Sequence, residues 1–227
     1  MARRVDFDDF TDNYNQLLSE KTQFFSSNEK YFARYKVNLV RKRVSSPVSR
    51  LLEYGCGIGR NISFLQKAFP DAVIVGSDIS GASLEIARRA NTGVEFVQGG
   101  ENLDSIGQFD LIFVAGVFHH VPIEQRVQVA RVLSKRLLPN GLLFVFEHNP
   151  FNPVTRHIVN KCPYDEDAVL LKPSELQGIL RQAALTVERK AYCLFVPPRL
   201  SVLVQLENLL GWLPLGGQYW VEARHVL

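Results

Sequence analysis

Short apolar runs alternate with amphipathic stretches through the middle of the chain. Runs rich in Val, Ile, Leu and Phe predict strands, and the amphipathic stretches between them predict helices. The predicted strands cover residues 50–55, 72–78, 94–99, 110–116 and 141–148, and the predicted helices cover residues 59–69, 80–90 and 122–138. Apolar strands that alternate with helices are typical of a parallel sheet covered on both faces. The pattern therefore predicts a doubly wound α/β fold.

The alternation of apolar runs and amphipathic stretches ends after Glu147. Two Asn-Pro steps indicate a long loop, which leads to a predicted helix at residues 174–184. An extended stretch at 186–196, a short helix near 200–210 and a last strand at 218–226 follow. Two late strands separated mainly by a short helix predict a hairpin-like end to the sheet, with one antiparallel strand.

The N-terminal part of the chain is predicted to be helical, with breaks, from residue 8 to about residue 44. It ends at Ser45–Pro47, where the alternating pattern begins. We therefore divide the chain into an N-terminal helical segment, residues 1–46, and an α/β domain, residues 47–227.

Composition narrows the class of protein. The chain has 227 residues, 46% of them hydrophobic and 22% charged, which is ordinary for a soluble globular domain. A net charge of +3 is too small to predict nucleic-acid binding. Three scattered cysteines fit a reducing cytoplasm, and the most apolar region is interrupted by Pro197, Pro198, Arg199 and Glu207. We therefore expect a cytoplasmic protein without a membrane span.

Three glycines (Gly55, Gly57 and Gly59) follow the first predicted strand, and Glu53 lies just before them. Glycine permits a sharp turn and lets a ligand approach the main chain. Asp78 ends the second predicted strand, where a carboxylate commonly accepts hydrogen bonds from ribose hydroxyls. Because a carboxylate at Glu53 would repel a pyrophosphate, these residues favour a nucleoside ligand that carries positive charge. The alternative is a structural turn beside a buried carboxylate that is satisfied by the backbone.

Four segments extend this argument: LLEYGCGIGRN, GSDIS, FDLIFVAGVFHHVP and RLLPNGLLFVFEHNP. In their order and spacing, residues 47 to about 150 resemble the class I S-adenosylmethionine-dependent methyltransferases. The resemblance implies S-adenosyl-L-methionine as the cofactor and a Rossmann-like, seven-stranded sheet whose last strand is antiparallel. That sheet agrees with the pattern described above.

The resemblance also implies which residues contact the methionine end of the cofactor. These are Glu53, Gly55, Cys56 and Gly57 around the first turn, with Ala115 and Gly116 after the fourth strand.

At the nucleoside end, the resemblance implies that Asp78 holds the ribose and that Ile79 packs against the adenine. Members of the family usually carry an aspartate after the third strand, which bonds to the adenine amino group. Here Gly100 stands in that place and Glu101 follows it. Either Glu101 replaces the aspartate with a longer reach, or a backbone group makes the contact.

His119 and His120 follow the fourth predicted strand, at the reacting end of the expected site. Histidine titrates near neutral pH, so either residue is a candidate general base, and His120 is favoured because it lies nearer the next helix. The alternative is that the pair caps that helix or packs on the loop. No metal site is predicted, because the spacing supplies no third ligand.

Candidate contacts with the methyl acceptor come from two other segments. Glu147, His148, Asn149 and Asn152 follow the fifth predicted strand, although Asn-Pro steps are also ordinary turn makers. Tyr14, Tyr31 and Tyr35 belong to the N-terminal segment, which small-molecule members of the family use as a lid. The alternative is that these aromatic residues pack against the sheet.

The leading hypothesis is a methyltransferase that acts on an O, N or C nucleophile of a small molecule. The alternatives are a catalytically silent homologue that binds the cofactor or serves as a scaffold, an enzyme that methylates tRNA or protein, and, against the glycine spacing, a nicotinamide-dependent oxidoreductase. The sequence predicts neither the acceptor nor the oligomeric state.

Overall fold

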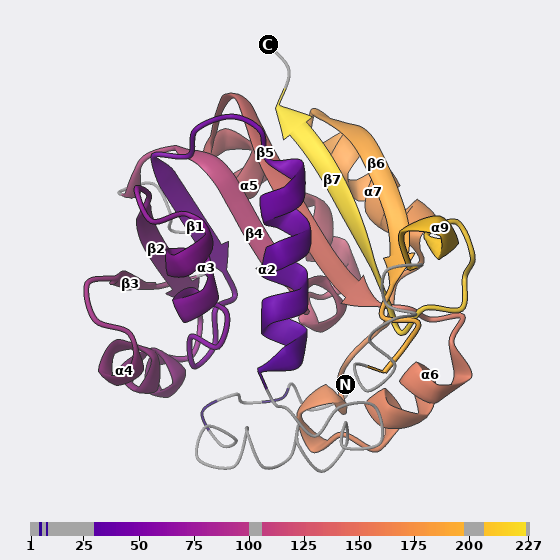
Figure 1. Cartoon of the computed structure of the whole chain (residues 1–227). Coiled ribbons are helices and arrows are strands. Elements are labelled where there is room, and N and C mark those ends of the chain that lie inside the picture. Colours follow the sequence, from indigo (N-terminus) through magenta and orange to yellow (C-terminus); the bar gives the residue numbers. More distant parts are fainter. Residues whose placement is uncertain (1–4, 6–7, 9–29, 100–105, 198–206, 226–227) are drawn as a thin grey trace.

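A seven-stranded sheet forms the centre of the computed structural model, in the order β3-β2-β1-β4-β5-β7-β6 (Figure 1). The structure describes residues 5, 8, 30–99, 106–197 and 207–225. The strands are β1 (Arg50–Tyr54), β2 (Val73–Asp78), β3 (Glu95–Gln98), β4 (Phe109–Ala115), β5 (Leu137–His148), β6 (Leu185–Cys193) and β7 (Gln218–His225). The first five strands pair in parallel, whereas β7 runs antiparallel to both of its neighbours. The predicted sheet, including its antiparallel last strand, is confirmed.

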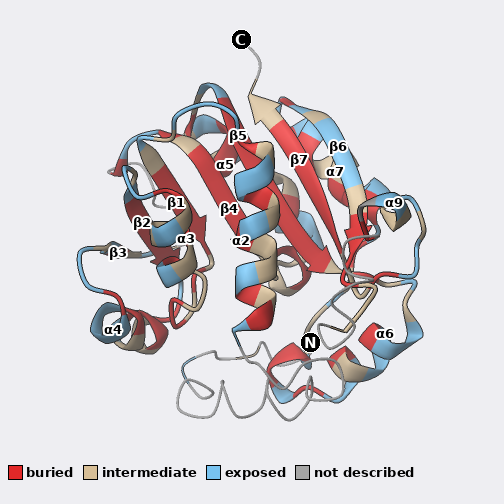
Figure 2. Ribbon diagram, in the orientation of Figure 1, coloured by how far each residue is buried: buried red, intermediate tan, exposed pale blue. Residues whose placement is uncertain are grey.

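Helices cover both faces of this sheet. The helices among the described residues are α2 (Tyr31–Arg43), α3 (Ile62–Ala68), α4 (Gly81–Ala90), α5 (Arg126–Lys135), α6 (Pro153–Asn160), α7 (Pro173–Gln182) and α9 (Glu207–Leu210). One apolar cluster joins α2, α3 and α4 to one face of the strands, and a second joins α5 and α7 to the other face. Figure 2 shows the result, with buried central strands between helices whose outer sides are exposed.

Side chains of the central strands alternate between these two clusters. Leu51 and Leu111 belong to the first cluster, whereas Leu52 and Ile112 belong to the second, and all four are fully buried. Each such side chain contributes about 1.5–3 kcal/mol relative to an exposed position. The apolar runs of the sequence thus form a rigid frame that fixes the loops at the strand ends.

Two predicted element boundaries need correction. The helix predicted at 122–138 is a 3-10 turn, η4 (Ile123–Gln125), followed by α5, and β5 begins at Leu137. Pro122 immediately precedes η4, while Ser80 caps α4 by accepting a hydrogen bond from the Ser83 backbone amide.

The segment after β5, predicted as a loop, contains a helix. In α6, the Asn152 side chain accepts hydrogen bonds from the amides of Val154 and Thr155, and Pro153 occupies the first turn. An Asn-Pro step is suited to this role, because asparagine caps and proline fits the first helical turn. The Asn152-Pro153 pair, which predicts a turn from sequence, therefore begins a helix.

At the N-terminal end, the structure confirms the last part of the predicted helical segment as α2. Residues 9–29, most of the predicted segment, lie outside the described residues, as do 200–206 of the helix predicted near 200–210. Among the helices that the structure describes, none has the length and apolar character to cross a membrane.

Candidate active site

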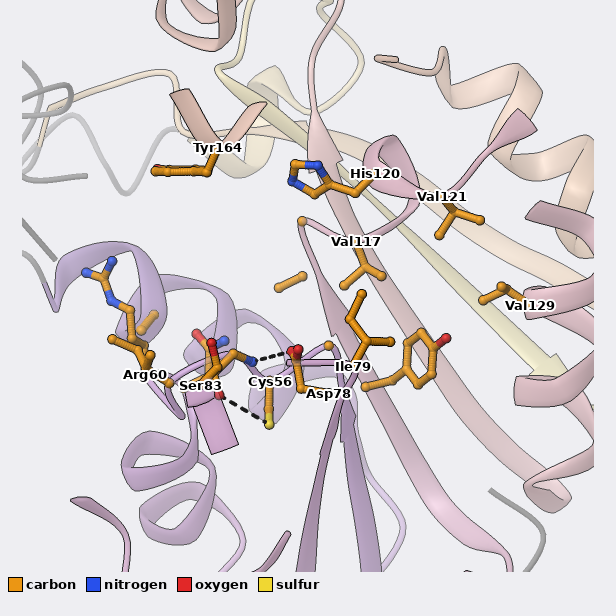
Figure 3. Close-up of a pocket in the computed structure, with 18 of the residues that line it drawn as sticks. Cys56, Arg60, Asp78, Ile79, Ser83, Val117, His120, Val121, Val129 and Tyr164 are labelled. Carbon is orange, nitrogen blue, oxygen red and sulfur yellow. Dashed lines mark hydrogen bonds between the residues drawn. The ribbon is translucent and has the colours of Figure 1, made fainter. Parts of the chain in front are cut away.

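A cavity of about 420 Å³ opens where the strand order reverses, between the carboxyl ends of β1 and β4 (Figure 3). Ligands of doubly wound sheets bind at such a switch point. Asp78 and Ile79 lie on one side of the cavity, and His120 and Tyr164 lie on the other. Helix α2 contributes Lys36 to the lining. One cavity therefore joins Asp78 and Ile79 with His120, which the sequence had singled out separately.

The glycine turn forms the floor at the end of β1. Gly55, Gly57 and Gly59 have φ angles of 71°, 51° and 77°, a left-handed backbone that favours glycine. A Cβ on Gly55 would lie 2.3 Å from a methyl of Val117, and one on Gly59 would lie 2.6 Å from the Asn91 amide nitrogen. A Cβ on Gly57 would meet no described atom within 4 Å. Gly55 and Gly59 are therefore required by packing, and Gly57 leaves space for a ligand.

Asp78 holds this turn against the second strand. One of its carboxylate oxygens accepts a hydrogen bond of 2.7 Å from the Gly57 amide, and the other accepts one of 3.0 Å from the Ser80 amide. Burial raises the pKa of the carboxyl, and the backbone donors oppose that rise. Asp78 lines the cavity together with Ile79, whose side chain is 49% exposed. A carboxylate and an apolar side chain therefore adjoin at the place predicted for ribose and adenine.

Glu53 lies behind the cavity wall rather than in it. Its side chain is buried, and one carboxylate oxygen accepts a 2.6 Å hydrogen bond from the side-chain amide of Asn61. The other oxygen is buried without a hydrogen-bond partner among the described residues. Burial raises the pKa of Glu53 to about 8, although Asn61 and Lys36 lower it. A buried acid with an unused oxygen suits a ligand that brings a positive charge.

The remaining predicted cofactor contacts divide into two groups. Cys56, Ala115 and Gly116 line the cavity, and burial raises the pKa of the Cys56 thiol far above its usual range, so this thiol is not a nucleophile. Gly100 and Glu101 lie outside the described residues, so the predicted adenine contact stays a prediction.

His119 and His120 form a short turn, η3 (Phe118–His120), directly after β4. Glu147 of β5 holds this turn in place. One of its oxygens accepts hydrogen bonds from the Val117 and Phe118 amides, and the other lies 2.6 Å from Nδ1 of His119. Glu147 is fully buried, and both of its carboxylate oxygens contact the turn. It therefore positions the histidines and does not face the cavity.

Asp165 joins the histidines from a distant segment. It ends the turn η5 (Pro163–Asp165), and its Oδ1 lies 3.6 Å from Nε2 of His119 and 3.3 Å from Nε2 of His120. Asp167 lies on the other side of His120, 3.5 Å from its Nδ1. Burial disfavours a charged His119, but Glu147 and Asp165 outweigh it and raise the pKa of His119 to about 9. The two histidines therefore lie within a ring of carboxylates.

The sequence did not point to Asp165, which belongs to an acidic run, YDED, that follows no recognisable spacing. The sequence predicts no metal site, because the spacing around His119 and His120 supplies no third ligand. In the structure Asp165 stands in that place, and its carboxylate and the two imidazoles offer donor atoms within 4.8 Å of one another.

The other predicted acceptor contacts lie elsewhere. The side-chain amide of Asn149 donates to the carbonyls of Pro214 and Gly216, and Asn152 caps α6, so both asparagines shape the loop. The His148 ring lies 5.0 Å from the ring of His119, and burial lowers its pKa to about 4. None of the three is among the described residues that line the cavity.

On α2, neither Tyr31 nor Tyr35 lines the cavity. Tyr31 is buried in the apolar cluster, and the Tyr35 hydroxyl donates to a carboxylate oxygen of Glu207, so packing is the role that the structure gives them. Tyr14 lies outside the described residues. Phe32 and Lys36 are the residues through which this helix lines the cavity, together with Ala33.

A parallel sheet with an antiparallel β7, a glycine turn at the switch point and an acid at the end of β2 define the fold of the class I methyltransferases. Residues 52–143 match the family model of a methyltransferase domain. In this part the chain is similar to methyltransferase domains, and its fold is that of the class I S-adenosylmethionine-dependent methyltransferases.

Individual relatives agree with this assignment. Over 131 residues, 56% of this chain and 50% of the relative, the sequence is 32% identical to a trans-aconitate 2-methyltransferase of Methylobacterium nodulans. It is 27% identical over 171 residues, 67% of this chain and 70% of the relative, to a ubiquinone biosynthesis O-methyltransferase of Marinobacter nauticus. The chain spans half or less of the length of the first curated relatives that it matches.

Among solved structures, the fold resembles a methyltransferase of Thermotoga maritima, described as S-adenosylmethionine-dependent and as a possible histamine N-methyltransferase. The TM-score is 0.67 at 19% identity, over 96% of this chain and 97% of the other. At that identity the likeness extends to the fold alone.

Proposed function

We propose that this protein transfers the methyl group of S-adenosyl-L-methionine to an O, N or C nucleophile of a small molecule. The observation that carries the proposal is the single cavity that connects the glycine turn and Asp78 with His120 and Tyr164. Cofactor and acceptor would meet in that space, at the distance that an in-line displacement requires.

The residues present fit this cofactor. Gly57 leaves open space where a side chain would stand, and Asp78 offers acceptor oxygens for ribose hydroxyls. Glu53, with a buried oxygen that has no hydrogen-bond partner among the described residues, provides compensation for the positive charge of the ligand. When bound, the cofactor supplies a methyl group on a positively charged sulfur, which leaves as a neutral thioether when the acceptor takes the methyl group.

In this proposal, residues after β4 prepare the acceptor. An oxygen or nitrogen nucleophile that carries a proton must lose it as the new bond to carbon forms, and a positioned base speeds such a step by about 10²–10⁴. His120 lines the cavity, whereas His119 is buried behind it and held by Glu147. We assign the contact with the acceptor to His120 and a positioning role to His119.

We also propose that residues 1–46 form a lid over the acceptor. Two described residues at the N-terminus support this arrangement. The Val5 amide donates a 2.9 Å hydrogen bond to Asp167, beside His120, and Asp8 accepts one from the Ser80 hydroxyl, beside Asp78. The N-terminal segment thus contacts both sides of the cavity, and α2 closes it with Phe32 and Lys36.

The test combines binding with turnover. S-adenosylhomocysteine should bind and raise the melting temperature, because a ligand that binds only the folded state stabilises it. Protein incubated with methyl-labelled cofactor and size-fractionated cell extract should then label the small-molecule fraction. Label in tRNA or protein would replace the proposed acceptor class, and binding without label would favour a silent homologue. Stabilisation by a nicotinamide dinucleotide alone would refute the proposal.

A further inference from the structure

We propose that His119, His120 and Asp165 form a binding site for a divalent transition-metal ion at the acceptor end of the cavity. The inference rests on the proposed function for its use, because the ion would act on the methyl acceptor. Binding itself depends only on the geometry of these three residues.

The three side chains offer donors of the right kind and spacing. One ring nitrogen of each histidine and one carboxylate oxygen of Asp165 lie within 4.8 Å of one another, and Oδ1 of Asp165 is 3.6 Å from Nε2 of His119 and 3.3 Å from Nε2 of His120. One ion can therefore contact all three residues after small side-chain movements. Two imidazoles and one carboxylate are the ligand set of many zinc and iron sites that keep a position open for substrate. The side chains of His119 and Asp165 are 2% and 5% exposed, which shields the site from bulk water.

The arrangement of lone pairs in this cluster favours a cation between the donor atoms. Because Nδ1 of His119 lies 2.6 Å from the Glu147 carboxylate, that nitrogen carries the hydrogen when the ring is neutral, and Nε2 then presents its lone pair to Asp165. Asp165 Oδ1 is buried and lacks a hydrogen bond of ordinary geometry to any described residue. Two lone pairs thus face each other unless a proton or a metal ion stands between them.

The Glu147–His119 pair matches the surroundings of a metal ligand. A ligating histidine almost always donates its other ring nitrogen to a carboxylate or carbonyl, which fixes the ring and its tautomer. Glu147 does this for His119 and is itself held by the Val117 and Phe118 amides. For His120, Asp167 lies 3.5 Å from the second nitrogen and can do the same.

The site adjoins the space where the acceptor would lie, since His120 and Tyr164 both line the cavity. A bound divalent ion lowers the pKa of an oxygen that coordinates it. An acceptor hydroxyl that reached the ion would release its proton to solvent, and its oxygen would then take the methyl group from sulfur. With the ion present, His120 would act as a ligand and no free base would be needed.

The experiment measures metal binding directly. Full-length protein, treated with chelator and then freed of it, is titrated with Zn²⁺ by calorimetry and with Co²⁺ by visible absorption, which reports coordination by nitrogen and oxygen. We expect one ion per chain. Asp165→Asn and His120→Gln should each weaken binding at least tenfold, and Glu166→Gln should leave it unchanged. Glu166 is the matched control because it is an exposed acid next to Asp165.

Failure of this inference can be told apart from failure of the proposed function. Each variant is also tested for binding of S-adenosylhomocysteine, which verifies its fold without using the metal site. Absence of Zn²⁺ and Co²⁺ binding in parent protein that binds S-adenosylhomocysteine would overturn the inference and leave a protonated histidine as the cation. Metal binding unaffected by Asp165→Asn and His120→Gln would also overturn it, since the ion would then lie elsewhere. Metal binding at these residues without cofactor binding would support the site and contradict the proposed function.

Discussion

The two sides of the cavity are built in different ways. The side proposed for the cofactor, called the cofactor side below, is made of main chain, from a glycine turn and a strand end, and Gly57 and Asp78 are only 21 residues apart. The side proposed for the acceptor, called the acceptor side below, is made of buried titratable side chains from more distant segments. His119 and Glu147 are 28 positions apart in the sequence, and His120 and Asp167 are 47 positions apart. The first presents backbone and one carboxylate to a ligand, and the second presents a group of titratable residues.

This difference determines how readily the residues on each side of the cavity can change. A backbone turn binds one chemical group and tolerates little change, because Gly55 and Gly59 have no room for a side chain. A cluster of side chains on η3 and η5 can change its residues without disturbing the sheet. Cofactor binding is therefore expected to depend on the fold, and acceptor choice on the loops after β4 and β5.

The largest effect is expected on the acceptor side. Replacing His120 by Gln removes the imidazole that lines the cavity, whether it serves as a base or as a metal ligand. Turnover should fall about 10²–10⁴-fold, while the dissociation constant for S-adenosylhomocysteine changes little, because its contacts lie on other loops. Steady-state kinetics and calorimetry on the same preparation would measure both.

A parental rate in this variant would mean that the histidines are structural. Catalysis would then rest on alignment of the two substrates, or on the His148 side of the loop after β5.

The sequence predicted the geometry around the glycine turn better than the geometry around the two histidines, for a physical reason. Glycine spacing and an acid at a strand end act through the local backbone, so Gly57 and Asp78 could be placed before the structure was known. Asp165 meets His120 only because η5 folds back over η3, and no local pattern reports that contact. The roles of Asn149 and Asn152 were open for the same reason, since turn makers and binding residues share one chemistry.

On the cofactor side, Asp78→Ala should weaken binding of S-adenosylhomocysteine by about ten- to 150-fold, since hydrogen bonds to a charged group contribute about 1.5–3 kcal/mol. The matched control is Asp110→Ala. Asp110 also accepts two backbone hydrogen bonds, from the amides of Ser49 and Arg50, but at the opposite end of the sheet. Calorimetry should show normal affinity in the control. If both variants lost affinity equally, the cause would be weakening of the strands, and not the loss of hydrogen bonds between Asp78 and the ribose.

Glu53 should make the stability of the free protein depend on pH. Its pKa is about 8 in the fold against an ordinary value near 4.5, so the folded state binds more protons than the unfolded state between these values. Stability is therefore lost as pH rises through this window, by about 1.4 kcal/mol per pH unit, or about 2 kcal/mol between pH 6 and 7.5.

Glu53→Gln keeps the shape of the side chain without this titration. Urea unfolding of both proteins at pH 6 and 7.5 should show a smaller loss in the variant by about that amount. Identical losses would show that Glu53 is ionised in the fold without a ligand. Its buried oxygen would then have a cationic partner before the cofactor binds.

The smallest expected effect is that of Gly57→Ala, which can be compared with Gly55→Ala in the same turn. Gly57→Ala adds a methyl group that meets no described atom, so its cost to folding is the left-handed backbone alone, about 1 kcal/mol. The methyl group would occupy the cavity, so binding of S-adenosylhomocysteine should weaken about tenfold or less. Gly55→Ala has the same backbone strain and also a clash with Val117 at 2.3 Å, so it should unfold at clearly lower urea concentration. If Gly57→Ala bound S-adenosylhomocysteine with parental affinity, the ligand would not approach the main chain at Gly57, and the space there would belong to the acceptor.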